Sequence, residues 1–479
     1  MRKSAPLVIK LLAAVLAITA TINSRAATYV VNTTDVDLPD TNTALAGCDA
    51  NPMVSGDQCT LRAAVMQANA QPGADTIVLP LNTTITLTIS GNGDASMGDL
   101  DITAPVTITS IVLGAPADAS DYPLIVANHS HRFFRVANNA NVTLRGMRLQ
   151  GGTPPGLEFG GALGTLAGTQ TLVDRVRFED NGAYAGGAIA TWGIVTVEDS
   201  DFVGNSAGGG GAAIYDEGIV TVRRSSLRES NVSQPNHSAV YVADGGWLTM
   251  ENTLIDGSDP GGSLYDTAGI YAIHPTSLIV RNSTLVDFDY RAIDVIANNS
   301  TSVRVYNTVA LGDDSNDCAI VAEAGTSPDV IVDYSMLRAS SDCDGYRDNF
   351  VYQASGPDSA GLAALASPLD SFIYYRRPLL NSQLVDIGTP DGMTGEPGLA
   401  CLATDQIGNM RPQDGDANGS ARCDIGAIEA ATQYSSTYTV NWFTQDLPDS
   451  NPGDDVCDAL ESTEYRLRLL RIEGCHALL

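Results

Sequence analysis

The chain has 479 residues, 44% of them hydrophobic, and a net charge of −30 at pH 7. So acidic a surface repels nucleic acids and anionic membranes, which excludes both as partners. Beyond the N-terminus, no stretch approaches the roughly 20 apolar residues of a transmembrane helix.

Residues 1–26 have the pattern of a secretory signal peptide. A basic start precedes an apolar run over residues 11–22, and the small-x-small sequence Ser24-Arg25-Ala26 follows. The apolar run is too short to span a membrane. The sequence therefore predicts export and a secreted or cell-surface location.

Within residues 27–80, the sequence predicts an edge strand followed by a polar loop over 28–41, and then a short capping helix. Four apolar side chains follow i, i+3, i+4, i+7 spacing on one helical face: Leu61, Ala64, Val65 and Ala68. Thr60 is suited to cap the start of this helix, and Pro72-Gly73 to end it.

The run Cys59-Thr60-Leu61-Arg62-Ala63-Ala64-Val65, followed by Ala68-Asn69-Ala70, resembles the CSLREA domain. Thr stands here for the Ser of that motif, and Ala for its Glu. The resemblance implies an N-terminal segment of a secreted bacterial surface protein with a β-helical body. It implies location and architecture, and no activity.

Residues 81–345 contain a short phrase that returns at steps of 23 to 30 residues. A period in this range is typical of a solenoid, and the runs are too short for helices. The phrase occurs as Val142-Thr143-Leu144, Leu172-Val173-Asp174, Val195-Thr196-Val197, Val220-Thr221-Val222, Leu248-Thr249-Met250, Leu278-Ile279-Val280, Val303-Arg304-Val305 and Val330-Ile331-Val332.

Two neighbouring segments, 177–191 and 201–215, match most closely. Their equivalent residues predict stacked pairs: Phe178 on Phe202, Asn181 on Asn205, and Ile189 on Ile214. We interpret the region as a right-handed parallel β-helix of about ten coils with about three short strands per coil. The phrasing at 178–189 also resembles polymorphic outer membrane protein repeats.

Eight cysteines form four local pairs, which predict disulfides in an oxidising compartment. The pairs are Cys48/Cys59, Cys318/Cys343, Cys401/Cys423 and Cys457/Cys475. Cys318 and Cys343 are one period apart, and coils about 4.8 Å apart allow a disulfide between them. The alternative is a pair of buried free thiols.

Residues 346–430 lose the period. The run Asp405-Gln406-Ile407-Gly408, then Arg411-Pro412 and the segment 423–429 (CDIGAIE), resembles the choice-of-anchor Q domain, and residues 384–388 (LVDIG) fit its earlier block. In that family the domain precedes a C-terminal surface anchor. Residues 431–479 repeat the start of the N-terminal module and then depart from it, so we interpret them as a truncated second CSLREA-like module.

Asp414, Asp416 and Asn418 have the D-x-D-x-N-G spacing of a calcium-binding loop. Oxygen ligands at alternate positions converge on one hard cation, so these residues are candidate Ca²⁺ ligands. Ile425 stands where such a loop supplies a bidentate Glu. The alternative is a solvated Asp/Gly loop.

Asp313 and Asp314 are the candidate catalytic acids if the chain is an enzyme. Asp317 is nearby, and Arg338 follows one period after Asp313. A glycoside hydrolase needs facing carboxylates, and a polysaccharide lyase needs acids with a base. An exposed acidic turn is the alternative. Trp192, Trp247 and many tyrosines are candidates for a sugar-stacking surface, although core and ladder roles compete for the same residue types.

The function that these patterns favour is adhesion or another surface interaction without catalysis, with an extracellular glycan or protein as the ligand. The alternative is a polysaccharide lyase or glycoside hydrolase on the same fold. The two differ in whether acids and a base from adjacent coils converge in one groove, since the fold alone does not decide.

Overall fold

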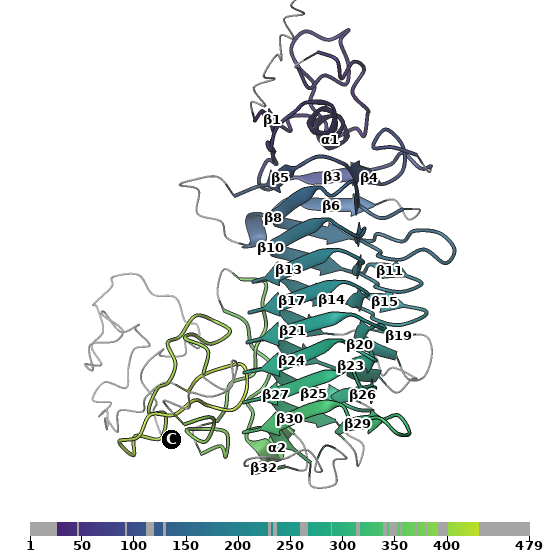
Figure 1. Ribbon diagram of the computed structural model, residues 1–479. Helices are drawn as coiled ribbons and strands as arrows, with labels where there is room; N and C mark the ends of the chain where they lie inside the picture. Colours follow the sequence, from purple (N-terminus) through teal and green to yellow (C-terminus); the bar gives the residue numbers. More distant parts are fainter. Residues whose placement is uncertain are drawn as a thin grey trace, which may run out of the picture.

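The computed structural model describes residues 26–430 except 46, 92, 112–118, 128–130, 229–230, 233–236, 259–266, 289, 313–316, 339–342, 344–351, 355–356, 369–370, 380 and 391–400. Across this part of the chain, parallel strands stack coil upon coil into a long solenoid (Figure 1). This confirms the predicted parallel β-helix. Nearly all of the predicted signal peptide, and the whole of 431–479 with Cys457 and Cys475, lie outside the described residues.

The first ladder of strands runs the length of the solenoid, and every pair in it is parallel. Its members are β1 (Thr28–Val30), β2 (Asp75–Val78), β5 (Val106–Thr109), β8 (Asn141–Gln150), β10 (Gln170–Glu179), β13 (Ile194–Glu198), β17 (Ile219–Arg223), β21 (Trp247–Glu251), β24 (Ser277–Arg281), β27 (Ser302–Tyr306) and β30 (Asp329–Asp333).

The second ladder shares the long strands β8 and β10 with the first, so that both belong to one 20-stranded sheet. Its other members are β3 (Thr84–Leu87), β6 (Leu124–Ala127), β14 (Asp201–Val203), β18 (Ser226–Arg228), β22 (Leu254–Asp256), β25 (Thr284–Phe288), β28 (Val309–Gly312), β31 (Met336–Leu337) and β32 (Tyr352–Gln353).

The third ladder is a separate nine-stranded sheet, which corresponds to eight full turns, slightly fewer than the expected ten or so. It contains β4 (Leu100–Ile102), β7 (Phe134–Val136), β9 (Leu163–Thr165), β12 (Ile189–Thr191), β16 (Ile214–Asp216), β20 (His237–Val242), β23 (Thr267–Ile273), β26 (Ile293–Ala297) and β29 (Cys318–Ala322). Three short strands, β11 (Gly182–Ala183), β15 (Ser206–Ala207) and β19 (Asn231–Val232), form a small extra sheet.

Alternate side chains of each strand point inward and form one continuous apolar core. Phe178 stacks on Phe202 with ring centroids 4.6 Å apart, and Ile189 pairs with Ile214, as the sequence predicted. The buried Asn205 Oδ1 accepts bonds from the backbone and side-chain nitrogens of Asn181, at 3.1 and 3.0 Å. The predicted Asn ladder is therefore confirmed.

One predicted alignment is wrong by a residue. Val142 pairs with Thr171 and Leu144 with Val173, so the phrase in that coil is 171–173 and not 172–174. Because successive side chains alternate between faces, this register places Val173 in the core and directs Asp174 to the outer face. There Asp174 is covered by its pairs with Arg145 and Arg175.

The bend between the first and second ladders has a regular chemistry. A residue with positive φ is followed by Ser or Thr, whose hydroxyl bonds to the carbonyl oxygen two residues back, as in Ser200 to Glu198 at 2.7 Å and Ser225 to Arg223 at 2.8 Å. Non-glycine residues occupy the positive-φ position, among them Asp199, Arg224, Asn252, Asn282 and Asn307. The stacked hydroxyls thus satisfy backbone groups that the bend removes from the ladders.

The predicted capping helix is α1 (Leu61–Ala70). The Thr60 hydroxyl accepts a 3.0 Å bond from the backbone N–H of Ala63, as expected for an N-cap. Ala64 and Val65 are buried against the first coils. The helix therefore covers the apolar end of the solenoid.

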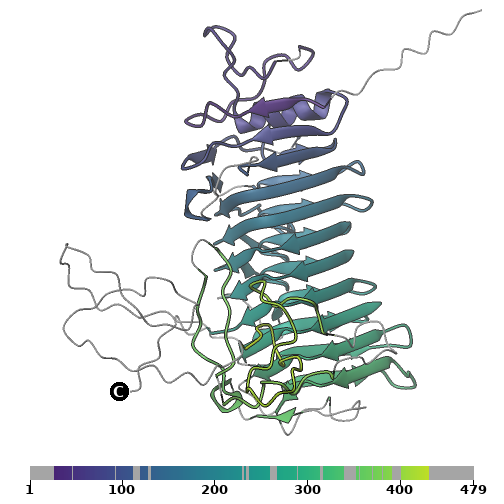
Figure 2. The ribbon, with the colours of Figure 1, turned by 90° about the vertical axis from the view of Figure 1, so that its left-hand side faces the viewer.

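The segment from 357 to 430 packs along the side of the lower coils instead of extending the solenoid (Figures 1 and 2). It begins with the short helix α2 (Pro357–Ala360), whereas the 3-10 helix η1 (Ala119–Asp121) belongs to an earlier loop. Arg376 pairs with Asp256 at 2.7 Å and also with Asp287. A second apolar cluster, which includes Leu384 and Ile425, joins this segment to the second ladder.

Three disulfides join Cys48 to Cys59, Cys318 to Cys343, and Cys401 to Cys423. All three pairings agree with the sequence analysis, and the second links adjacent coils. Among the described residues, no helix is long and apolar enough to cross a membrane.

Candidate functional site

A column of tyrosines stands on the outer face of the third ladder. Register places Tyr215 on β16 beside Tyr241 on β20, and Tyr241 beside Tyr271 on β23. In β16 the flanking residues, Ile214 and Asp216, are fully buried, so the alternation of the strand directs Tyr215 outward. The first two rings are stacked with centroids 5.3 Å apart, and the second and third are 5.5 Å apart.

Three further aromatic side chains extend this column toward the N-terminus. Phe159 packs edge-on against Tyr184, Trp192 and Tyr215, with ring centroids 5.7, 5.4 and 5.3 Å away. We call the six residues Phe159, Tyr184, Trp192, Tyr215, Tyr241 and Tyr271 the aromatic strip. Tyr184 is 41% exposed and the others are half-buried, so the strip is an accessible surface.

Arg132 positions the loop that carries Phe159. Its Nη1 donates a 2.8 Å bond to the carbonyl oxygen of Phe159, and its guanidinium pairs with Glu158 and with Asp99. The side chain lies close over Gly164, where a Cβ would be only 2.7 Å from Nη1. A larger residue there would displace the end of the Arg132 side chain.

The glycine run 208–211 lies against the rings. A Cβ at Gly209 would be 2.8 Å from the ring of Tyr184, and one at Gly210 would be 2.7 Å from that of Tyr241. Gly210 also has φ +131°, which side chains disfavour. The run therefore allows backbone and rings to pack closely.

Glu217 is a charged residue that bonds to two members of the strip. One carboxylate oxygen accepts a 2.6 Å bond from the hydroxyl of Tyr215, and the other accepts a bond from Nε1 of Trp192. The residue is nevertheless exposed. Two aromatic donors thus fix an accessible anion in one orientation.

The tyrosine hydroxyls remain protonated donors. Burial and the bond to Glu217 raise the pKa of Tyr215, and burial also raises the pKa values of Tyr241 and Tyr271. Among the described residues, none bonds to the hydroxyl of Tyr241 or Tyr271. These two hydroxyls are therefore available to a ligand.

Asp216 lies beneath the strip on the inner side of β16. One of its oxygens accepts a 2.7 Å bond from the backbone N–H of Gly218, and the other is buried without a partner. Burial raises the pKa of Asp216 to about 7. Because Asp216 is fully buried, we assign it no contact with a ligand.

The candidate acids Asp313 and Asp314 lie outside the described residues, so their role stays a prediction. Their neighbour Asp317 is buried and accepts bonds from the backbone N–H groups of Gly312 and Arg338, both at 2.8 Å. The Arg338 guanidinium also pairs with it at 3.3 Å. Adjacent coils thus bring an acid and an arginine together here, in a bonded structural pair.

The structure brings the candidate calcium ligands Asp414 and Asp416 together, and Asp386 joins them from a distant segment. The three carboxylates suit a hard cation. In the described arrangement their oxygens accept backbone N–H bonds: Asp386 from Asp416 and Arg422, and the other two from Asn418. The Asn418 side-chain nitrogen donates to Asp416, and its side-chain oxygen accepts from Ser420.

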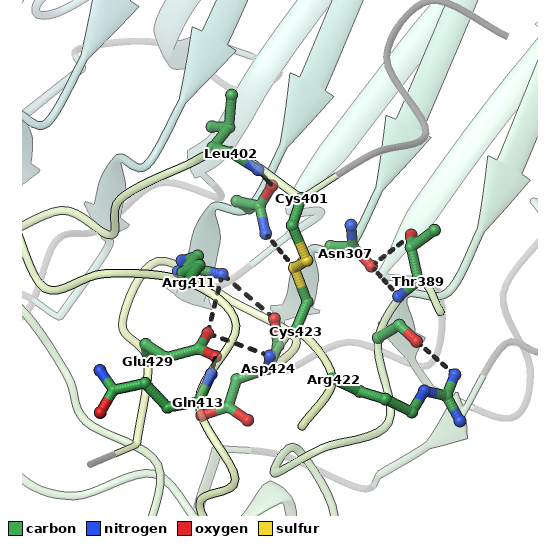
Figure 3. Close-up of a disulfide and its surroundings, with 12 residues drawn as sticks. Asn307, Thr389, Cys401, Leu402, Arg411, Gln413, Arg422, Cys423, Asp424 and Glu429 are labelled. Atoms are coloured by element: carbon green, nitrogen blue, oxygen red, sulfur yellow. Dashed lines mark hydrogen bonds and ion pairs between the residues drawn. A yellow bond between two sulfur atoms is a disulfide. The ribbon is translucent and has the colours of Figure 1, made fainter. Parts of the chain in front are cut away.

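The residues that resemble the choice-of-anchor Q domain meet around Cys401–Cys423 (Figure 3). Arg411, fully buried, lies 3.5 Å from Glu429 and donates to the carbonyl oxygens of Asp424 and Gly426. Burial raises the pKa of Asp424 to about 8 and also raises that of Glu429. The residues around Arg411 therefore form a buried hydrogen-bond network and not an exposed reactive surface.

The cap contains an equivalent buried network, which the sequence pattern did not predict. Arg62 is fully buried, and its guanidinium forms a two-bond pair with Asp37 at 2.7 and 3.0 Å. It also donates to the carbonyl oxygens of Ala95 and Gly98, both at 2.9 Å. An arginine on the apolar side of a predicted helix was the signal, because a charge there needs a partner.

No family model matches this chain, and no curated protein matches it. Among solved structures, it is similar to the crystal structure of pectate lyase Pel9A, at 13% identity and a TM-score of 0.34. The similarity covers 86% of this chain and 98% of that one. Likeness at this level supports no statement about activity.

Proposed function

We propose that this protein is a secreted or surface-exposed bacterial solenoid that binds an extracellular glycan along the aromatic strip without cleaving it. The observation that carries the proposal is the outward tyrosine column at 215, 241 and 271, one ring per coil. Successive coils repeat at about 4.8 Å, which is close to the length of one sugar unit in an extended polysaccharide.

The chemistry of the strip suits sugars. A pyranose ring has apolar C–H faces and a rim of hydroxyls, so it needs aromatic surface together with polar groups. Tyr and Trp provide both, since each has an apolar body and a polar tip. The hydroxyls of Tyr241 and Tyr271 have no partner among the described residues, and Glu217 offers further acceptor capacity.

The proposal also covers the regions on either side of the solenoid, residues 27–80 and 346–430. We propose that 27–80 is a CSLREA-like cap and 346–430 a choice-of-anchor Q-like domain, because the residues of each resemblance occupy buried networks centred on Arg62 and Arg411. Three disulfides suit a protein of an oxidising compartment. A surface location would present the solenoid to glycans outside the cell.

A glycan array tests the proposal with the exported chain and two single variants, Tyr241→Ala and Tyr271→Ala. Removing an anchoring aromatic side chain should weaken binding by about tenfold or more. Trp247→Ala is the matched control, because Trp247 is 47% exposed but belongs to the first ladder and not to the strip. Equal loss in the control, or no binding by the parent, would contradict the proposal.

The same samples also test the enzymatic alternative. Release of unsaturated or reducing sugar ends would identify a lyase or hydrolase and direct attention to Asp313 and Asp314. Binding with intact glycan would favour adhesion. Asp313→Asn with Asp314→Asn should then leave binding unchanged.

A further inference from the structure

We propose that the strip selects glycans with free amino groups, and that Glu217 is the counter-ion for one protonated amine. This inference rests on the proposed glycan binding and specifies the ligand class. Its basis is the exposed carboxylate held between Trp192 and Tyr215, with the ring of Phe159 packed against both. Aromatic rings and a carboxylate together attract an ammonium ion.

The geometry of Glu217 is fixed before a ligand arrives. Each of its oxygens already accepts one bond from an aromatic donor, and each retains a further lone pair. The side chain therefore does not have to be ordered on binding, which lowers the entropic cost. A neutral hydroxyl would also bond to it, but an ammonium group adds the charge interaction.

The charges around the strip exclude acidic glycans. The nearby arginines are neutralised, because Arg132 pairs with Asp99 and Glu158, and Arg291 pairs with Asp294 at 2.9 Å.

Farther along the face, His274 lies between two acids. It is 3.0 Å from Glu323 and 3.8 Å from Asp244, whose side chain is 81% exposed. The described residues around the strip thus carry an excess of carboxylates, on a chain of net charge −30. A polyuronate would meet repulsion there, whereas an amino-sugar polymer would meet attraction.

The test compares three oligosaccharide probes by calorimetry on the exported chain: glucosamine oligomers, the same oligomers N-acetylated, and oligogalacturonate. At about pH 6 the amines are protonated. Glucosamine oligomers should bind about tenfold more tightly than the acetylated ones. Oligogalacturonate should not bind.

Glu217→Gln should reduce this discrimination to about twofold while binding of the acetylated probe persists. Asp244→Asn removes one negative charge from an exposed position near His274, and this variant should retain most of the discrimination. Intrinsic fluorescence, to which Trp192, Trp247 and Trp442 all contribute, checks that each variant is folded.

The outcomes separate the two proposals. Equal affinity for the free-amine and acetylated probes, tighter binding of oligogalacturonate, or unchanged discrimination in Glu217→Gln would each overturn the choice of ligand while glycan binding stands. An equal loss in Asp244→Asn would reduce the effect to general charge attraction and overturn the role of Glu217. Absence of binding to any glycan, on the array as well, would overturn the proposed function itself.

Discussion

Replacing Asp216 with Asn should make the protein markedly less sensitive to pH. Asp216 is fully buried on β16, and burial raises its pKa from 3.8 to about 7. The folded protein therefore holds this proton more tightly than the unfolded chain does. The stabilising contribution is fully present below the unfolded pKa, and it is lost as the pH rises through about 7.

The size of this loss of stability follows from the difference between the pKa of Asp216 in the unfolded chain and its pKa in the folded protein. Each pH unit between the unfolded and folded pKa values costs about 1.4 kcal/mol of unfolding free energy, so about three units cost about 4 kcal/mol. Most of this loss, about 3 kcal/mol, falls between about pH 5 and about pH 8. Asn has nearly the same shape and no charge, so the variant lacks this loss.

Urea denaturation of both proteins at about pH 5 and about pH 8 measures the effect. The stability of Asp216→Asn relative to the parent should increase by about 3 kcal/mol between the two pH values. Any constant effect of the amide cancels in this comparison. Asp244→Asn, at an exposed position, should show no such change. A difference between Asp216→Asn and the parent that is the same at both pH values would refute the reasoning.

Three further predictions concern the cap, the core and the C-terminal segment. Arg62→Met leaves Asp37 buried without a cation and should destabilise the cap by about 3–5 kcal/mol, measured as faster hydrogen exchange in α1, whereas the half-exposed Arg135→Met should not. Asn205→Ala leaves two donors of the preceding coil unpaired and should lower the urea-derived stability by about 2–4 kcal/mol; a loss below about 1 kcal/mol would contradict the ladder. Added Ca²⁺ should raise the melting temperature of the parent and not of Asp386→Asn, and chelation should reverse the rise; an unchanged parent would remove the calcium prediction.

The periodic part of the fold was predictable because equivalent positions of stacked coils carry similar residues. Phe178 and Phe202, or Cys318 and Cys343, occupy equivalent places, so their spacing reports the length of a coil. The bends were harder to predict. Arg224 adopts a positive φ that is usually associated with Gly or Asn, because the neighbouring hydroxyl bonds and the stacked coils impose it.

The aromatic strip was only partly predictable. Trp192 was a candidate for sugar stacking, but Phe159 comes from a loop, and nothing in its local sequence indicates its neighbours. Tyr241 and Tyr271 are register partners although 30 residues separate them, against 26 between Tyr215 and Tyr241, so a constant period does not align them. Aligning the apolar-Tyr-apolar triplets around Tyr241 and Tyr271 would have found this part of the column.

The C-terminal segment also determines how the solenoid would carry mechanical load. It bonds to four successive coils, through Ser226, Asn252, Thr284 and Asn307. A plain solenoid couples each coil only to its neighbours, so tension at its end peels off the last coil first. Here, tension applied through the C-terminal side would be shared by several coils in shear, which resists peeling. An adhesin held under flow would benefit from this distribution of force.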